Sequence, residues 1–450
     1  MDLKEQTEAR SYESQSSDPL VREVFSGKIP LEQALQRLRM RLLDLSPRNR
    51  LLSYRHPKGR SIQFVDAPNL NLVFERLIEN NRNLVIKYVP EPDPKSYQGK
   101  RPEVRQHAET LGIQTPVDFD PSCCGPTEHR HTPKLQALFY PAELDRLCRR
   151  IASEARTVIE ETGTNMLYLM FGFLEFYERD DSERILLAPL LAVPVTLERE
   201  GIDSDSRTYI YSIAYSGEDI TENLTLREKL RQDFTLSLPE FEEDDTPGMY
   251  LEKIRHSTRN RKRWAVRCQL SLGFLSFGKL AIWDDLNPKK WPNLLDHSLL
   301  KEIFSGGNVS SVSLTAEDYN IDTHELCDLP LIFDADSSQH SAIIDVLSGK
   351  NMVIIGPPGT GKSQTITNII ATALHKGKTV LFVSEKLAAL EVVRRRLNMA
   401  GLGCFCLELH SHKTQKKSFL PTFRNVWIKL SPSLDSSRIS LKHYPNKENN

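Results

Sequence analysis

Eight consecutive residues of this 450-residue chain have the types and the spacing needed to hold phosphate groups. They fit the pattern G-x-x-x-x-G-K-[ST] and are Gly356, Pro357, Pro358, Gly359, Thr360, Gly361, Lys362 and Ser363. Glycines let the backbone turn tightly with its N–H groups pointing inward, where they meet negative charge. Lys362 would reach the β- and γ-phosphates, and the Ser363 hydroxyl would bind Mg²⁺. The pattern predicts a site for a nucleoside triphosphate with Mg²⁺; the alternative is a glycine-rich turn that fits by chance.

The loop needs a strand before it and a helix after it. Residues 351–355 contain the apolar, β-branched run Met-Val-Ile-Ile, which is typical of a strand covered on both faces. After Ser363, the apolar residues Ile366, Ile369, Ile370 and Ala373 recur at helical spacing. The order of strand, loop and helix favours a true phosphate site over a chance match.

A polar segment at residues 334–343 opens a short helix upstream and contains Gln339. With the loop and the Gln364 that follows it, this segment resembles the superfamily 1 DNA and RNA helicases. The resemblance implies that Gln339 reads the edge of adenine; the alternative is an ordinary exposed helix glutamine. It also implies a fold class, an α/β P-loop NTPase with a partial RecA-like lobe and a parallel sheet, preceded by an α+β accessory domain. ATP and Mg²⁺ are the implied cofactors, and DNA or RNA is the implied partner.

Residues 379–384 predict a second buried strand, and residues 385–393 predict a helix. Their junction resembles helicase motif Ia, which touches the backbone of a single strand. The resemblance makes Ser384 and Lys386 candidate phosphate contacts. A helix cap and a solvated lysine are the alternatives.

Composition limits the class of protein. The chain has 59 Lys and Arg against 60 Asp and Glu, so a nucleic-acid site must be a local patch. No stretch approaches ~18 uninterrupted apolar residues and no apolar signal segment opens the chain, so we expect a cytoplasmic location without a membrane partner. Seven scattered cysteines favour reduced thiols. Cys123 and Cys124 with His129 and His131 favour an incidental loop over a zinc site, because adjacent cysteines chelate one ion poorly.

The N-terminal part predicts helices and strands in mixed order. Residues 44–52 and two apolar segments near residues 171–176 and 187–195 resemble an uncharacterised domain that precedes the core of large bacterial helicase-like proteins. Arg48 and Arg50 could contact phosphate, and ion pairing with Asp44 is an equal alternative. The expected domains are a disordered leader at 1–27, an accessory domain at 28–310 with a long loop at 90–133, a partial RecA-like ATP-binding lobe at 311–418 and an irregular tail at 419–450.

Hydrophobic periodicity predicts the main elements of the accessory domain. Helices are expected from Pro30 to about Asp44 and at residues 70–78, 141–161 and 224–233, and strands at residues 62–65, 84–89, 185–197 and 208–215. Residues 166–177 could be helix or strand, and residues 265–277 predict a pair of strands.

The densest basic cluster contains Arg261, Lys262 and Arg263, with Trp264 beside it. This cluster could follow a nucleic-acid backbone while Trp264 stacks on a base. A solvated, charged helix end is the alternative.

Hydrolysis needs further groups that the sequence after Lys362 does not display. They are the Walker B carboxylates, which hold Mg²⁺ and position water, and an arginine supplied across a cleft. The likeness to the helicases stops after Lys417, which suggests a premature stop or frameshift, or a regulatory fragment. We therefore expect ATP binding with poor turnover in the N-terminal portion of a superfamily 1 helicase-like protein. A protein partner or the missing C-terminal half could supply the groups needed for hydrolysis.

Two other functions are compatible with the sequence. One is a nucleotide-responsive module that binds nucleic acid or protein without motor activity. The other is a nuclease, which is disfavoured because no carboxylate pair with a lysine has metal-binding spacing.

Overall fold

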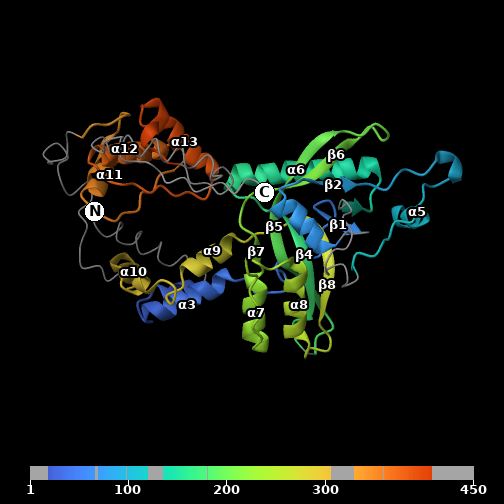
Figure 1. The fold of residues 1–450 in the computed structure, drawn as a ribbon. Coiled ribbons are helices and arrows are strands. Elements are labelled where there is room, and N and C mark those ends of the chain that lie inside the picture. The colour runs from blue at the N-terminus through green and yellow to red at the C-terminus, as the bar shows by residue number, and fades with distance from the viewer. Residues whose placement is uncertain are drawn as a thin grey trace, which may run out of the picture. The chain divides into compact units, whose positions relative to one another are not determined.

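The chain forms two compact units in the computed structural model (Figure 1). The structure describes residues 19–65, 69–97, 99–119, 135–179, 181–305, 329–357 and 359–407. One unit contains Met1–Arg156 and Asn165–Val312, and the other contains Thr157–Thr164 and Ser313–Asn450. The expected leader before residue 19, the cysteine and histidine cluster at 123–131 and the tail after residue 407 lie outside the described residues.

The first unit is built on a closed, mixed sheet. Seven strands follow the order β4-β8-β1-β3-β2-β6-β5, and pairing of β4 with β5 closes the ring. The strands are β1 (Ser61–Val65), β2 (Leu84–Lys87), β3 (Leu135–Ala137), β4 (Leu167–Tyr177), β5 (Ile185–Ile202), β6 (Tyr209–Tyr215) and β8 (Ala265–Phe274), and the short β7 (Thr221–Glu222) also pairs with β5. Only β2 and β3 run parallel; the other neighbours are antiparallel. Closure leaves the ring without an unpaired edge.

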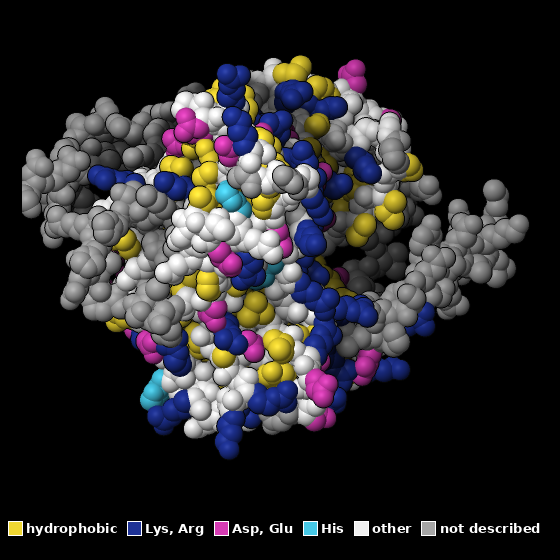
Figure 2. Space-filling view, turned by 90° about the vertical axis from the view of Figure 1, so that its right-hand side faces the viewer, with side chains coloured by type: hydrophobic (Ala, Val, Ile, Leu, Met, Phe, Trp, Pro, Cys, Tyr) yellow, Lys and Arg dark blue, Asp and Glu magenta, His cyan; other side chains and the backbone are white. Residues whose placement is uncertain are grey.

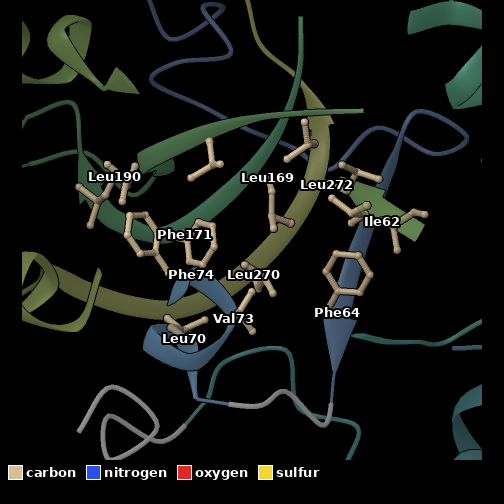
Figure 3. Close-up of a cluster of buried hydrophobic side chains, with 14 of the residues drawn as sticks. Ile62, Phe64, Leu70, Val73, Phe74, Leu169, Phe171, Leu190, Leu270 and Leu272 are labelled. Carbon is tan, nitrogen blue, oxygen red and sulfur yellow. The ribbon is translucent and has the colours of Figure 1, made fainter. Parts of the chain in front are cut away.

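The inside of this sheet is the main hydrophobic core (Figure 3). Side chains from β1, β4, β5 and β8 point toward one another and toward the helix after β1 in this close-up. The labelled residues are Ile62, Phe64, Leu70, Val73, Phe74, Leu169, Phe171, Leu190, Leu270 and Leu272. Phe74 meets Phe171 edge to face, with ring centroids 5.9 Å apart. Burial of these large side chains is the dominant favourable contribution to the folding of the first unit.

A bulge in β4 explains a glycine in this core. Phe171 pairs with Leu270 of β8, but Phe173 pairs with Arg267, so the register shifts at Gly172. Gly172 has φ +69°, and a Cβ there would lie 2.3 Å from Leu251 Cδ2. A bulge with a left-handed residue suits glycine, and here the packing of Leu251 requires it as well.

Helices cover the sheet and extend the first unit. Pro141–Thr162 forms α6 (Figure 1). This helix packs Leu144, Leu147, Cys148 and Ile151 into the main core. The other helices are α2 (Pro19–Val24), α3 (Leu31–Leu42), α4 (Leu70–Phe74) continued by the π-helix η1 (Glu75–Glu79), η2 (Pro94–Ser96), α5 (Val104–Thr110), α7 (Leu224–Phe234), α8 (Pro247–Thr258), α9 (Gly278–Asp285), η4 (Pro292–Leu295) and α10 (Ser298–Phe304).

Most predicted elements of the first unit are confirmed. The helices expected from Pro30 to about Asp44, at 141–161 and at 224–233 are α3, α6 and α7, and the ambiguous run at 166–177 is the strand β4. The prediction of two strands at 265–277 was wrong, because Ala265–Phe274 is one continuous strand between β4 and β1. Its alternating pattern reflects two different sides of one strand.

The second unit is helical in the described residues. It contains α11 (Ser337–Leu347), α12 (Lys362–His375), α13 (Leu387–Met399) and the short η6 (Gly403–Phe405). Ile343, Ile344 and Leu347 of α11 form a small core with Leu329 and Ala373. A second small cluster joins Ile370 of α12 to Val393 and Leu397 of α13.

The predicted fold class, a P-loop NTPase lobe with a parallel sheet behind an α+β domain, was wrong. The sheet that the structure contains is the closed mixed ring of the first unit. The segments at 351–355 and 379–384 form no strand in the described part of the second unit, and Val353, Ile355, Leu381 and Val383 are 85%, 90%, 82% and 75% exposed. An extended apolar segment becomes a strand only when neighbouring strands bond its backbone, and periodicity cannot reveal whether such neighbours are present.

Candidate functional site

The phosphate-loop pattern folds as a tight turn that leads directly into α12. Gly359 and Gly361 have φ values of +92° and +78°, and the helix begins at the next residue, Lys362. Thr360 Oγ1 donates a hydrogen bond to Pro357 O at 2.9 Å, which closes the turn. Pro358, the remaining residue of the pattern, lies outside the described residues. The left-handed backbone at Gly361 explains why the pattern requires glycine at that position, and Gly359 meets the same need at a position that the pattern leaves open.

Close packing requires the first glycine of the loop as well. A Cβ on Gly356 would lie 2.6 Å from Thr360 Oγ1 and 2.8 Å from Lys362 Cγ. The stem of Lys362 therefore lies across the start of the loop, and the lysine remains exposed at the first position of α12. Ser363 follows it, half-buried. A cation and a hydroxyl thus stand together at the positive end of a helix, where phosphate groups bind.

Gln339 lies against the loop although 21 residues separate it from Thr360. The Asp336 carboxylate caps α11 by accepting the Gln339 N–H at 2.8 Å, which fixes where the side chain begins. Gln339 Nε2 donates to Thr360 O at 3.0 Å and lies 2.6 Å from the position of a Cβ on Gly361. The residue that the resemblance assigned to adenine is therefore next to the phosphate loop.

A second set of hydrogen bonds joins α12 to the segment before α11. Gln364 Nε2 donates to Asp334 O at 2.5 Å, and Asn368 binds both backbone groups of Phe333, at 3.1 Å through Oδ1 and at 3.0 Å through Nδ2. Asn368 is fully buried. Asn368 was not among the predicted site residues, although a polar residue on the apolar face of a helix is a usable signal.

The loop suits a nucleotide better than a metal bound by protein alone. Among the described residues, no group of three or more His, Cys, Asp and Glu side chains could hold a metal ion. Lys362 and Ser363 have no hydrogen bond or ion pair to a carboxylate in the part of the chain that the structure describes. The chemistry available is therefore phosphate binding by backbone N–H groups, an ammonium group and a hydroxyl.

The candidate strand contacts lie at the start of α13. Ser384 Oγ donates to Lys386 O at 3.3 Å, and Lys386 is the exposed residue just before the helix. The serine therefore stabilises the turn, while the lysine side chain points to solvent. Their contact with nucleic acid stays a prediction.

The basic cluster of the first unit lines a pocket of about 250 Å³ together with Tyr177 and Asn260. Arg261 lies over the Phe234 ring at 5.0 Å and donates to Phe234 O at 3.2 Å. Arg263 lies 3.8 Å over the Tyr177 ring. Both arginines therefore have partners within the chain, and the exposed Lys262 lies between them.

Trp264 is not an exposed stacking platform. Its ring meets Phe234 and Phe176 edge to face, with centroids 5.0 and 5.7 Å apart. These contacts place the indole at the margin of the main core. A base could stack on Trp264 only if its contacts with Phe234 and Phe176 were broken. Contact of Arg261, Lys262 and Arg263 with phosphate groups stays a prediction.

Comparisons with known proteins agree with this division of the chain. Residues 334–419, which include Gln339 and the phosphate loop, match a family described as an AAA domain. The part of the second unit that carries the phosphate-loop pattern is therefore similar to an AAA domain. Residues 41–230 match a family described as a protein of unknown function, DUF4011.

Two curated relatives are helicases by name. The Mycoplasma genitalium "Uncharacterized ATP-dependent helicase MG140" is 48% identical over 73 residues, which cover 16% of this chain and 6% of that protein. Its Mycoplasma pneumoniae homolog is 28% identical over 277 residues, which cover 55% of this chain and 23% of that protein. The chain therefore spans less than a quarter of the length of either relative. No solved structure matches this chain.

The search for membrane-spanning helices gave a negative result. In the described ranges, every helix is too short or too polar to cross a lipid bilayer.

Proposed function

We propose that this chain binds ATP with Mg²⁺ at the phosphate loop, as the nucleotide-binding part of a helicase-like protein that acts on DNA or RNA. The AAA domain match and the two helicase relatives support the class of protein. Gly356, Gly359 and Gly361 shape the loop, Lys362 binds the terminal phosphates and Gln339 approaches the adenine. When bound, Mg²⁺ neutralises phosphate charge, and Ser363 is the described residue that would hold it.

The observation that carries this proposal is that Gln339, Gly361 and Lys362 lie together at the phosphate loop. The side chain of Gln339 lies on Gly361, whose left-handed backbone leads into the helix that begins with Lys362. A chance glycine turn would not bring the adenine-side glutamine and the phosphate-side lysine onto one loop. Local sequence order alone does not enforce that meeting, because the two residues belong to different helices.

We further propose that the chain hydrolyses ATP poorly by itself. The loop from Gly356 to Ser363 contains no carboxylate that could position water beside the γ-phosphate. Turnover would then depend on groups supplied from elsewhere. Binding and hydrolysis are separable in this proposal.

Titration with a fluorescent ATP analogue and Mg²⁺ tests the proposal, with phosphate release followed in the same samples. Lys362→Ala removes one charge-assisted contact, which is worth about 1.5–3 kcal/mol, so affinity should fall about 10- to 150-fold. Lys376→Ala is the matched control, because Lys376 is an exposed lysine at the other end of the same helix. Equal affinity of wild type and Lys362→Ala would refute the binding site, and sustained phosphate release would refute poor hydrolysis.

A further inference from the structure

A loop between α3 and β1 in the first unit contains a pocket that the phosphate site does not use. The arginine loop, residues 47–57, lines about 340 Å³ of space with Pro47, Arg48, Arg50, Ser53, Tyr54, Arg55 and Pro57. It lies in the segment that matches the family of unknown function.

Buried anchors hold this loop in one conformation. Leu51, Leu52 and Tyr54 are at most 4% exposed and lie between Arg50 and Arg55 in the chain. Tyr54 N–H donates to Leu187 O of β5 at 2.8 Å, and Asn223 Nδ2 donates to Leu51 O at 2.5 Å. The arginines therefore project from a fixed backbone, which lowers the entropy that a ligand must remove on binding.

The turn that follows Arg55 is strained and supported. His56 has φ +44°, which is unusual for a residue other than glycine. Its ring meets Tyr54 and Phe173 at 5.0 and 5.5 Å, and its Nε2 lies 3.0 Å from Ser271 Oγ. The surrounding structure thus maintains a costly backbone conformation between Arg55 and Pro57, as binding sites often do.

Three guanidinium groups of this loop lack a counter-charge. Arg48, Arg50 and Arg55 are exposed, and the described part of the chain offers none of them an ion pair or a side-chain hydrogen bond. Asp44, which the sequence offered as an ion-pair partner for Arg48 and Arg50, instead accepts a hydrogen bond from the Ser46 N–H at 3.0 Å. The nearby Arg60 differs, because Glu154 neutralises it. Positive charge is therefore concentrated at the pocket in a chain whose total charge is near zero.

Figure 2 shows Lys and Arg side chains in a band along one face, with acidic side chains scattered beside it. The near balance of charges in the whole chain thus conceals local positive surfaces.

We propose that Arg48, Arg50 and Arg55 bind successive phosphate groups of a single nucleic-acid strand. Guanidinium forks match phosphate oxygens and are weakly hydrated, so they suit this ligand better than lysines would. The pocket is at the small end of the range for ligand sites, about 300–1,000 Å³, and its arginines are exposed. That geometry fits a strand passing over the pocket better than an enclosed free nucleotide. This inference rests on the proposed action on DNA or RNA.

Strand binding by the full chain tests the inference. Fluorescence anisotropy would measure the affinity of the chain for labelled single-stranded DNA and RNA of about twenty nucleotides, at salt concentrations between about 50 and 200 mM. The test variant is Arg48→Gln with Arg50→Gln and Arg55→Gln. The control is Arg82→Gln with Arg146→Gln and Arg207→Gln, which removes the same charge from three exposed arginines of the same unit.

We expect the test variant to bind at least tenfold more weakly than the control variant. Each phosphate contact on a single strand contributes about 0.7 to the slope of log affinity against log salt, so the slope should fall by about 2. Equal strand affinity of the two variants, or wild type that binds no strand, overturns the inference. Loss of fluorescent ATP binding in the arginine variant with strand binding intact would also overturn it, because the pocket would then take a free nucleotide.

Lys362→Ala separates this inference from the nucleotide site. Strand binding without nucleotide should survive in Lys362→Ala, since the arginine loop does not use Lys362. Failure of ATP binding in the wild type would refute the proposed nucleotide site. Strand binding, which is measured without nucleotide, would still test the arginine loop. Unchanged urea unfolding midpoints of the arginine variants would show that they fold.

Discussion

Replacing Gly361 with alanine is expected to weaken ATP binding about 5- to 30-fold. Gly361 has φ +78°, and the left-handed region costs a residue with a Cβ roughly 1–2 kcal/mol. The loop must either retain that strain or leave the conformation that leads into α12. Because about 1.4 kcal/mol corresponds to a tenfold change in affinity, this cost alone gives the stated range.

The added methyl group would also disturb Gln339. Its Cβ would lie 2.6 Å from Gln339 Nε2, which is too close for atoms that are not bonded. The flexible amide can move away, but it then loses its hydrogen bond to Thr360 O, worth about 0.5–1.5 kcal/mol. The adenine contact proposed for Gln339 should weaken together with the loop.

Titration with the fluorescent ATP analogue separates these two effects. Gly377→Ala is the matched control, since Gly377 has φ +70° in the same unit and nothing lies within 4 Å of its added Cβ. Gln339→Ala, alone and with Gly361→Ala, completes a double-mutant cycle. We expect the double variant to bind better than the sum of the two single losses predicts. Wild-type affinity in Gly361→Ala would refute the reasoning from backbone conformation, and strict additivity would refute the contact with Gln339.

Two further predictions concern stability. Asn368→Ala removes the hydrogen bonds to both backbone groups of Phe333, so the free energy of unfolding of the second unit should fall by about 1–3 kcal/mol. The urea unfolding transition should then come at a lower concentration. Thr235→Ala, at an exposed helix end, is the control and should leave the transition unchanged. Burial lowers the pKa of His56 to about 4, so as the pH falls the unfolded chain binds a proton at His56 before the folded chain does. The neutral, buried His56 therefore contributes its full stability to the fold above about pH 6.5, and this contribution is lost as the pH falls toward 4. Unfolding midpoints across this range should drop less steeply in His56→Gln, and parallel curves for the two proteins would contradict the assignment.

Local chemistry was readable from the sequence because it depends on residue types at short spacing. The loop from Gly356 to Ser363, the helix after it and the long helix α6 needed only a motif and a 3.6-residue period. Gln339 came from a resemblance to a family, and its contact with Thr360 places it next to the loop that the motif predicts.

The same reasoning could not determine which strands become neighbours. The predicted strands at 351–355 and 379–384 lack partners in the described residues, and the closed sheet forms instead from seven segments spread over residues 61–274. Strand pairing is nonlocal, since each ladder depends on a second segment whose position the first does not encode. Asn368 was missed for a related reason, because its partner, Phe333, precedes it by 35 residues.

The sequence by itself determined the phosphate-loop pattern and the helix after it, and it predicted which residues would face a nucleotide, because glycine conformation, charge and helix period are properties of short segments. Only the tertiary structure decided that Gln339 lies on Gly361, that Trp264 packs at the margin of the core, and that Arg48, Arg50 and Arg55 have no counter-charge among the described residues. Those outcomes depend on which distant segments bury one another, and burial is a property of the whole fold.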